Sequence, residues 1–174
     1  MVKIISIANQ KGGVGKTTTA INLATSLSAI NKKTLLIDAD PQGNASTGIG
    51  ISYEKRSPNL YDLIVSEFLD LNAIKKTIVP GLDVITANTN LAASEIELAE
   101  VESREFVISN LLSKIEGYDY VLIDCPPALG LLTINALVAS NSIIIPLQSE
   151  FFALEGVSSL VNSIELIRES FNPN

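Results

Sequence analysis

The chain has 174 residues and a net charge of −7, with one cysteine and no histidine. A chain of this length predicts a single domain whose core needs no disulfide or metal to hold it together. The acidic balance argues against a broad basic face for nucleic acid, and the lack of histidine removes the commonest general base. Any chemistry must therefore use carboxylates, lysines, hydroxyls, backbone amides and a hard metal ion.

The apolar runs of the chain are short. The first of them, at 4–8, is far too short for the apolar region of a signal peptide, and it leads into a polar segment. No stretch approaches the roughly 18 uninterrupted apolar residues of a membrane span. We therefore expect a cytoplasmic protein.

Apolar, β-branched runs alternate with helical patterns along the whole chain. This alternation predicts an α/β fold, a three-layer doubly wound sheet that is mostly parallel and has helices on both faces. Ligands of such sheets bind beyond the carboxyl ends of the strands. In chain order we expect a strand at 2–8, a helix at 17–29, a strand at 34–37, a loop at 42–57, short helices at 59–65 and 70–76, a strand at 82–86, a helical stretch at 90–115, a strand at 118–123, a helix at 131–139, a strand at 142–146 and a helix at 153–171.

A glycine-rich turn joins the first strand to the first helix. It departs from the usual phosphate-loop pattern because Gln10 stands at the first glycine position. Its glycines allow backbone amides to point inward at phosphate oxygens, and the helix that follows presents its positive end to the anion. Lys16 can bridge the β and γ phosphates, and the Thr17 hydroxyl suits Mg²⁺. The candidate nucleotide-binding run is Lys11, Gly12, Gly13, Val14, Gly15, Lys16, Thr17 and Thr18.

Acidic residues follow two further predicted strands. Asp38 and Asp40 come after the second strand, and Asp124 follows the buried run at 118–123. Asp38 suits a helix cap or turn as well as a supporting role in a site, so we leave it outside the catalytic set. Cys125 is interpreted as a small buried filler, because nothing near it in sequence lowers its pKa.

Lys11 is a second lysine at the start of the glycine loop, which is the deviant Walker A form of the ParA/MinD group of ATPases. The stretches at 9–23, 38–46, 124–130 and 146–156 resemble, in the same order, the motifs of ParA/Soj chromosome and plasmid partition proteins. The resemblance covers essentially the whole chain. It implies a P-loop NTPase fold and a Mg²⁺-dependent ATPase that switches a sandwich dimer.

The resemblance also implies roles for individual residues. Lys11 would reach the phosphates of the partner in an ATP-dependent homodimer, and Gly12 would lie at the subunit contact. Asp40 would position or polarise the attacking water, and Asp124 would belong to the Mg²⁺ site. Gln148 and Glu150 would lie near the nucleotide or the dimer contact. The implied catalytic residues are Lys11, Lys16 and Asp40, and the implied metal residues are Thr17 and Asp124.

Partners follow from the same resemblance. It implies a ParB-like centromere-binding protein that stimulates hydrolysis, and non-specific DNA with nucleoid association, but no membrane. Family members are commonly longer than 174 residues, so we expect residues 1–174 to be one ATPase domain that is incomplete at its C-terminus. The alternative is a truncated nucleotide-binding fragment with little ATPase or DNA-binding activity.

Two neighbouring functions fit the chain less well. A MinD-like membrane cycle needs a basic amphipathic C-terminal helix, whereas the apolar side of the 153–171 helix has a core-packing pattern. An iron-protein reductase needs two cluster cysteines in each subunit, and this chain has one.

Overall fold

The computed structural model describes residues 2–66, 68–148 and 153–173. Within them, six strands form one sheet in the order β3-β4-β2-β5-β1-β6. All neighbouring strands are parallel except β3 and β4. The strands are β1 (Lys3–Ile7), β2 (Thr34–Asp38), β3 (Ile74–Lys76), β4 (Leu82–Ile85), β5 (Tyr120–Asp124) and β6 (Ser142–Ile144).

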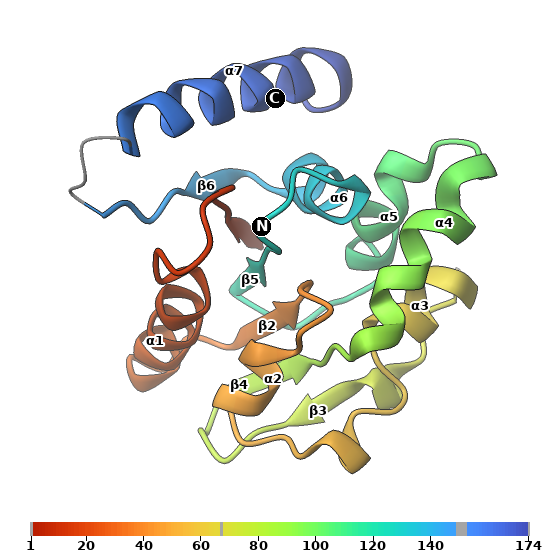
Figure 1. The fold of residues 1–174 in the computed structure, drawn as a ribbon. Coiled ribbons are helices and arrows are strands. Elements are labelled where there is room, and N and C mark those ends of the chain that lie inside the picture. Colours follow the sequence, from red (N-terminus) through yellow and green to blue (C-terminus); the bar gives the residue numbers. More distant parts are fainter. Residues whose placement is uncertain (1, 67, 149–152, 174) are drawn as a thin grey trace.

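Helices cover both faces of this sheet (Figure 1). Alternate residues of β2 show the two faces: Leu36 packs in one apolar cluster with Ala20 and Ala24, whereas Leu35 and Ile37 pack in the other. The three-layer, doubly wound fold predicted from the sequence is therefore confirmed. The α-helices are α1 (Lys16–Ala29), α2 (Asn44–Gly48), α3 (Leu60–Ser66), α4 (Ser94–Glu97), α5 (Val107–Leu112), α6 (Leu131–Ala139) and α7 (Ala153–Phe171).

Helix α7 packs on α6 along one side. Leu160 is buried, Ile164 and Ile167 are partly buried against the core, and the Phe171 ring makes an edge contact with Phe106 at 5.9 Å. The expectation that this helix packs on the core is met by Ile164 and Phe171, whereas Val161, expected on the same side, is exposed and Leu160 is buried in its place. No helix in the described part of the chain is long and apolar enough to cross a membrane.

The predicted helix at 70–76 is wrong. Only Leu71–Ala73 forms a single 3-10 turn, capped by the Asp70 carboxylate, which accepts a hydrogen bond from the Asn72 amide at 2.9 Å. The chain then extends as β3 and pairs antiparallel with β4. A run of three residues is too short for its polar and apolar positions to show a strand period, which is why the pattern suggested a helix.

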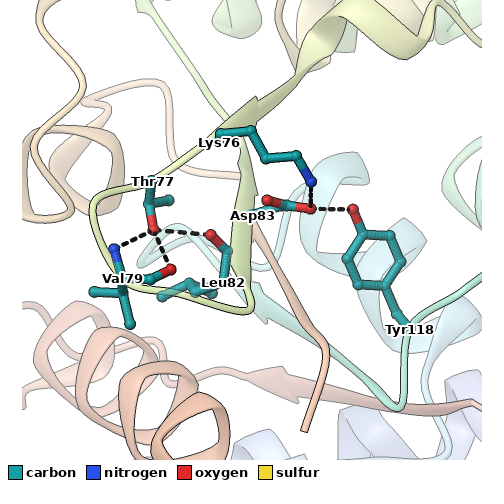
Figure 2. A network of polar contacts seen from close by, with 6 residues as sticks. All are labelled: Lys76, Thr77, Val79, Leu82, Asp83 and Tyr118. Atoms are coloured by element: carbon teal, nitrogen blue, oxygen red, sulfur yellow. Dashed lines mark hydrogen bonds and ion pairs between the residues drawn. The ribbon is translucent and has the colours of Figure 1, made fainter. Parts of the chain in front are cut away.

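Side-chain contacts hold the β3–β4 hairpin (Figure 2). Asp83 of β4 is buried, and one of its oxygens accepts from Lys76 Nζ at 2.8 Å and from the Tyr118 hydroxyl at 2.7 Å. The Thr77 hydroxyl donates to Leu82 O at 2.8 Å. Because β4 begins at Leu82, this network and the adjoining cavity of about 380 Å³ lie at the amino ends of the strands.

Two other predictions are corrected. The stretch at 90–115 is not one helix: Thr89–Ala93, Leu98–Glu100 and Arg104–Phe106 are 3-10 turns, and α4 and α5 are short. The helical turns stop at Val101, whose ψ of 131° is extended, and Ser103, with a φ of 57° in the left-handed region, also cannot continue a right-handed helix. The predicted loop at 42–57 contains α2 and a 3-10 turn at Tyr53–Lys55.

Candidate nucleotide site

The glycine loop after β1 and the acidic residues at the ends of β2 and β5 meet at one edge of the sheet. Strands β2, β5 and β1 are neighbours in that order. In their register Asp124 pairs with Ile7 on one side and with Asp38 on the other. The segments that follow these three strands therefore lie side by side, at the carboxyl edge where the sequence places a ligand.

The glycine loop is open toward solvent. Gly13 and Gly15 have φ values of +76° and +91°, a region that side chains rarely adopt. A Cβ added to Gly12, Gly13 or Gly15 would meet nothing within 4 Å. These glycines therefore face open space, and the loop leads directly into the N-terminus of α1, where anions bind favourably.

Residues distant in sequence hold the loop in place. Asn9 accepts from the Lys11 amide at 2.9 Å and donates to Pro146 O at 2.8 Å. Gln148 donates from Nε2 to Gly13 O at 3.1 Å, so its side chain lies against the glycine loop. Glu150 lies outside the described residues.

Lys16 lies inside the loop, and its side chain is buried. Its ammonium donates to Lys11 O at 3.1 Å. Burial lowers the pKa of Lys16, while the charges of Asp124 and Asp40 act in the opposite direction. A buried ammonium whose hydrogen bond is to a neutral carbonyl gains most from an arriving anion such as phosphate.

Asp124 is fully buried, and neither of its carboxylate oxygens has a hydrogen-bond partner. Burial, together with the charges of Asp38 and Asp40, raises its pKa to about 7 against the opposing effects of the nearby Thr17 hydroxyl and Lys16. Buried polar groups are normally paired, so an unpaired carboxylate requires an explanation. Two free oxygens next to a threonine hydroxyl fit a Mg²⁺ ion.

The rest of such a coordination shell is absent from the described side chains. They contain no group of three or more His, Cys, Asp or Glu that could hold a metal. Mg²⁺ commonly uses only one or two protein oxygens and takes the remainder from substrate phosphates and water. The donor set therefore suits a metal that arrives with a nucleotide.

Asp38 supports the site without lining it. One of its oxygens accepts from the amide and the hydroxyl of Ser46, both at 2.7 Å, and the Ser46 hydroxyl accepts from the Ala87 amide at 3.0 Å. Burial raises the pKa of Asp38 to about 6, and these hydrogen bonds oppose the rise. The N-cap of α2 is Gly43, and the Asp38 carboxylate holds the first turn of this helix from the end of β2, so it supports the turn and is not a local helix cap.

Asp40 stands at the start of the next turn and is nearly buried. Its Oδ1 accepts from the Gln42 amide at 2.9 Å, and its backbone oxygen accepts from the Gly43 amide at 2.9 Å. It lies close enough to Lys16 and Asp124 to raise the pKa of both.

The remaining expected residues differ in exposure. Val14 is buried and Thr17 is partly buried, whereas Lys11, Gly12 and Thr18 are exposed. Cys125 is buried, and burial raises the pKa of its thiol, which agrees with its role as a filler. Two supporting residues, Asn9 and Ser46, received no role from the sequence, although both lie in the stretches at 9–23 and 38–46. Their contacts to Pro146 and Ala87 join segments distant in the chain, which no local pattern signals.

Known proteins are similar to this chain in sequence and in fold. A family model described as an AAA domain matches residues 2–174. The chain is 51% identical to the chromosome partitioning protein ParA of Caulobacter vibrioides, over 99% of this chain and 66% of that protein. It is also 51% identical to the sporulation initiation inhibitor protein Soj of Bacillus subtilis, over 99% of this chain and 68% of Soj. The chain belongs to the ParA/Soj family.

A solved structure shares the fold of this chain. Cobyrinic acid a,c-diamide synthase of Mycobacterium smegmatis, with bound ATP analogue and magnesium, superposes with a TM-score of 0.94 at 34% identity, over 99% of this chain and 71% of that one. This ParA/Soj-family chain therefore has the fold of P-loop NTPases. It spans about two thirds of the length of the curated relatives it matches.

The raised pKa of Asp124 gives a testable pH dependence. Between the ordinary value of 3.8 and about 7, the folded chain holds a proton that the unfolded chain has lost. Stability of the nucleotide-free protein therefore falls as the pH rises through this window. Asp124→Asn removes the charge, so its free energy of unfolding relative to wild type should be about 2 kcal/mol higher at pH 8 than at pH 5.

Urea unfolding of both proteins at the two pH values measures this difference. Glu102→Gln, an exposed acid-to-amide change, is the matched control and should show no such pH-dependent difference. If the difference in unfolding free energy between Asp124→Asn and wild type is the same at pH 5 and pH 8, the pKa of Asp124 is not raised in the folded chain.

Proposed function

We propose that the chain binds ATP with Mg²⁺ in the glycine loop and hydrolyses it, as a deviant Walker A ATPase of partition type. The observation that carries this proposal is the buried, unpartnered carboxylate of Asp124, which lies near Thr17 and Lys16 behind an open glycine loop. Relatives named as partitioning proteins and a neighbour with bound ATP analogue and magnesium support it.

Each group has a defined task in this proposal. The amides of the glycine loop bind the phosphates, and the Lys16 ammonium exchanges Lys11 O for phosphate oxygens. Thr17 and Asp124 hold Mg²⁺, which supplies positive charge against the phosphate oxygens when bound. Asp40 orients the water that attacks the γ-phosphorus. The bond from that phosphorus to the β–γ bridging oxygen breaks, leaving ADP and inorganic phosphate.

We further propose that two copies meet across the nucleotide. Lys11 and Gly12 are exposed at the rim of the loop, where a second copy can approach. A lysine that reaches the partner's phosphates adds positive charge as the leaving oxygen gains negative charge, as an arginine finger does. Residues 1–174 act as one ATPase unit in this scheme.

The partners proposed here follow the family. They are a ParB-like centromere-binding protein that stimulates hydrolysis and, for full-length members of the family, non-specific DNA of the nucleoid in the cytoplasm. The nucleotide state switches the dimer between DNA-bound and released forms, because the loops after β2 and β5 contact the γ-phosphate only before cleavage.

Lys11→Ala tests the dimer. We expect wild type to shift from monomer to dimer with a non-hydrolysable ATP analogue and Mg²⁺, and Lys11→Ala to remain monomeric while binding the analogue about as tightly as wild type does. Light scattering coupled to size exclusion measures the mass. Lys32→Ala, an exposed lysine outside the loop, is the control and should dimerise normally.

The opposite result would select the other candidate. A wild-type chain that binds the analogue and stays monomeric at every concentration cannot supply Lys11 in trans. These 174 residues would then be a nucleotide-binding fragment with little ATPase activity, and the dimer-based mechanism would be wrong for them.

A further inference from the structure

Arg56 is a buried arginine outside the groups described so far, with only 5% of its surface exposed. No ion pair joins it to a carboxylate anywhere in residues 2–66, 68–148 and 153–173. Its guanidinium bonds to neutral oxygens instead, and its Cζ lies 5.7 Å from the centre of the Tyr53 ring. The charge of Arg56 acts on the exposed Glu54 carboxylate without forming an ion pair with it. Burying a cation with so little counter-charge is costly, and an apolar side chain would fill the space at lower cost.

The hydrogen bonds of Arg56 join three parts of the chain. Nη1 donates to Ala87 O, just after β4, at 3.2 Å. Nη2 donates to the Thr47 hydroxyl of α2 at 2.7 Å, and Nε donates to Ile51 O at 3.4 Å. The planar fork of a guanidinium can serve such divergent acceptors at once, which an ammonium cannot do.

These bonds lead to Asp40 in two steps. The Thr47 hydroxyl, which accepts from Arg56, donates to Gly43 O at 3.1 Å. The Gly43 amide in turn donates to Asp40 O at 2.9 Å and closes the turn that begins at Asp40. The contacts thus lead from the guanidinium, through Thr47 and the Gly43 residue, to the backbone oxygen of Asp40.

Gly43 shows how closely Arg56 packs against this turn. Its φ is +64°, and a methyl group at this position would overlap Nη1 of Arg56 and lie 2.9 Å from Ala87 O. The guanidinium therefore lies directly on the backbone of the turn. A displaced Arg56 removes this contact and also the hydrogen bond to the Thr47 hydroxyl, which itself donates to Gly43 O.

We propose that Arg56 is a positioning residue for the reaction: it holds the 40–43 turn, so that the Asp40 carboxylate stays in place at the mouth of the nucleotide site. The effect on catalysis rests on the proposed function. The effect on the turn does not, because the contacts are present in the chain without nucleotide.

Two variants test this role. Arg56→Lys keeps the positive charge but removes the planar guanidinium with its several donors. Thr47→Val keeps the shape of an exposed side chain and removes the hydroxyl that lies between Arg56 and Gly43. Thr47→Val also covers the case in which Arg56→Lys does not fold. Arg104→Lys makes the same change at an arginine whose contacts, Ala99 O and Glu105, lie away from the site.

Hydrogen exchange of the nucleotide-free protein is the first measurement. We expect the Gly43 and Thr47 amides to exchange at least about tenfold faster in both variants, with no change in the middle of α1. Arg104→Lys should leave both amides at the wild-type rate. Unchanged exchange at Gly43 and Thr47, or the same acceleration throughout the chain, would overturn the positioning role.

ATP hydrolysis is the second measurement. We expect kcat to fall at least about tenfold in both variants, while the affinity for ATP with Mg²⁺ stays within about twofold of wild type. An unchanged kcat in variants whose turn exchanges faster would overturn the catalytic part. If wild type itself does not hydrolyse ATP, the proposed function fails, and hydrogen exchange still decides whether Arg56 holds the turn.

Discussion

Replacing Lys16 by alanine is expected to weaken ATP binding by at least about a hundredfold, because charge-assisted hydrogen bonds to phosphate are among the strongest available to the site. The Lys16 ammonium lies inside the loop. The groups that stabilise its positive charge there are the Lys11 carbonyl oxygen and the carboxylates of Asp124 and Asp40. No other cation within the loop is buried beside the open space. Isothermal titration calorimetry with ATP and Mg²⁺ measures the loss.

The folding control for this variant follows from the same burial. Burial lowers the pKa of Lys16, so its charge costs free energy in the nucleotide-free protein. Lys16→Ala should therefore unfold at a temperature no lower than wild type. Lys32→Ala should bind ATP as wild type does. Wild-type affinity in a folded Lys16→Ala protein would place the phosphates outside the glycine loop.

Replacing Asp40 by alanine is expected to leave ATP affinity within about threefold of wild type and to lower turnover at least about a hundredfold. The charge of Asp40 acts on Asp124, and its carboxylate accepts a hydrogen bond within its own turn. The amides proposed to bind phosphate belong to the glycine loop, which is a separate segment. Its carboxylate should therefore act mainly on the attacking water. Phosphate release under saturating ATP measures turnover, and calorimetry measures affinity.

Asp40→Asn separates the two contributions of this side chain. An asparagine keeps an oxygen that can accept from the Gln42 amide, so it preserves the turn and removes the charge. If charge matters, Asp40→Asn should be as inactive as Asp40→Ala. Near-normal turnover in the asparagine variant would reduce Asp40 to a turn-forming residue, and unchanged turnover in both would remove it from the mechanism.

Local patterns predicted the parts of the site that lie next to each other in sequence. The glycine loop, the strand before it and α1 form one continuous stretch, and the buried strands β2 and β5 are apolar runs that end at Asp38 and Asp124. In a parallel sheet, residues at the carboxyl ends of adjacent strands must be neighbours. Knowing the fold class was therefore enough to bring these groups together.

Contacts between distant segments could not be predicted in the same way. Asn9 and Pro146 are 137 positions apart, and Arg56 and Ala87 are 31 apart. Nothing in the polar stretch at 42–57 distinguishes Arg56 from a solvated arginine. The acidic stretch at 90–115 has no glycine or proline where its helical turns are interrupted. The left-handed residue there is Ser103, and a serine gives no sequence signal of a helix break.

The most direct test of the account is equilibrium binding of a fluorescent ATP analogue to the wild-type chain, with Mg²⁺ and after chelation by EDTA. The proposed nucleotide site should give saturable binding that unlabelled ATP displaces and that weakens at least about tenfold without Mg²⁺, because Thr17 and Asp124 then lose the ion that joins them to the phosphates. No saturable binding to a chain that circular dichroism shows to be folded would contradict it.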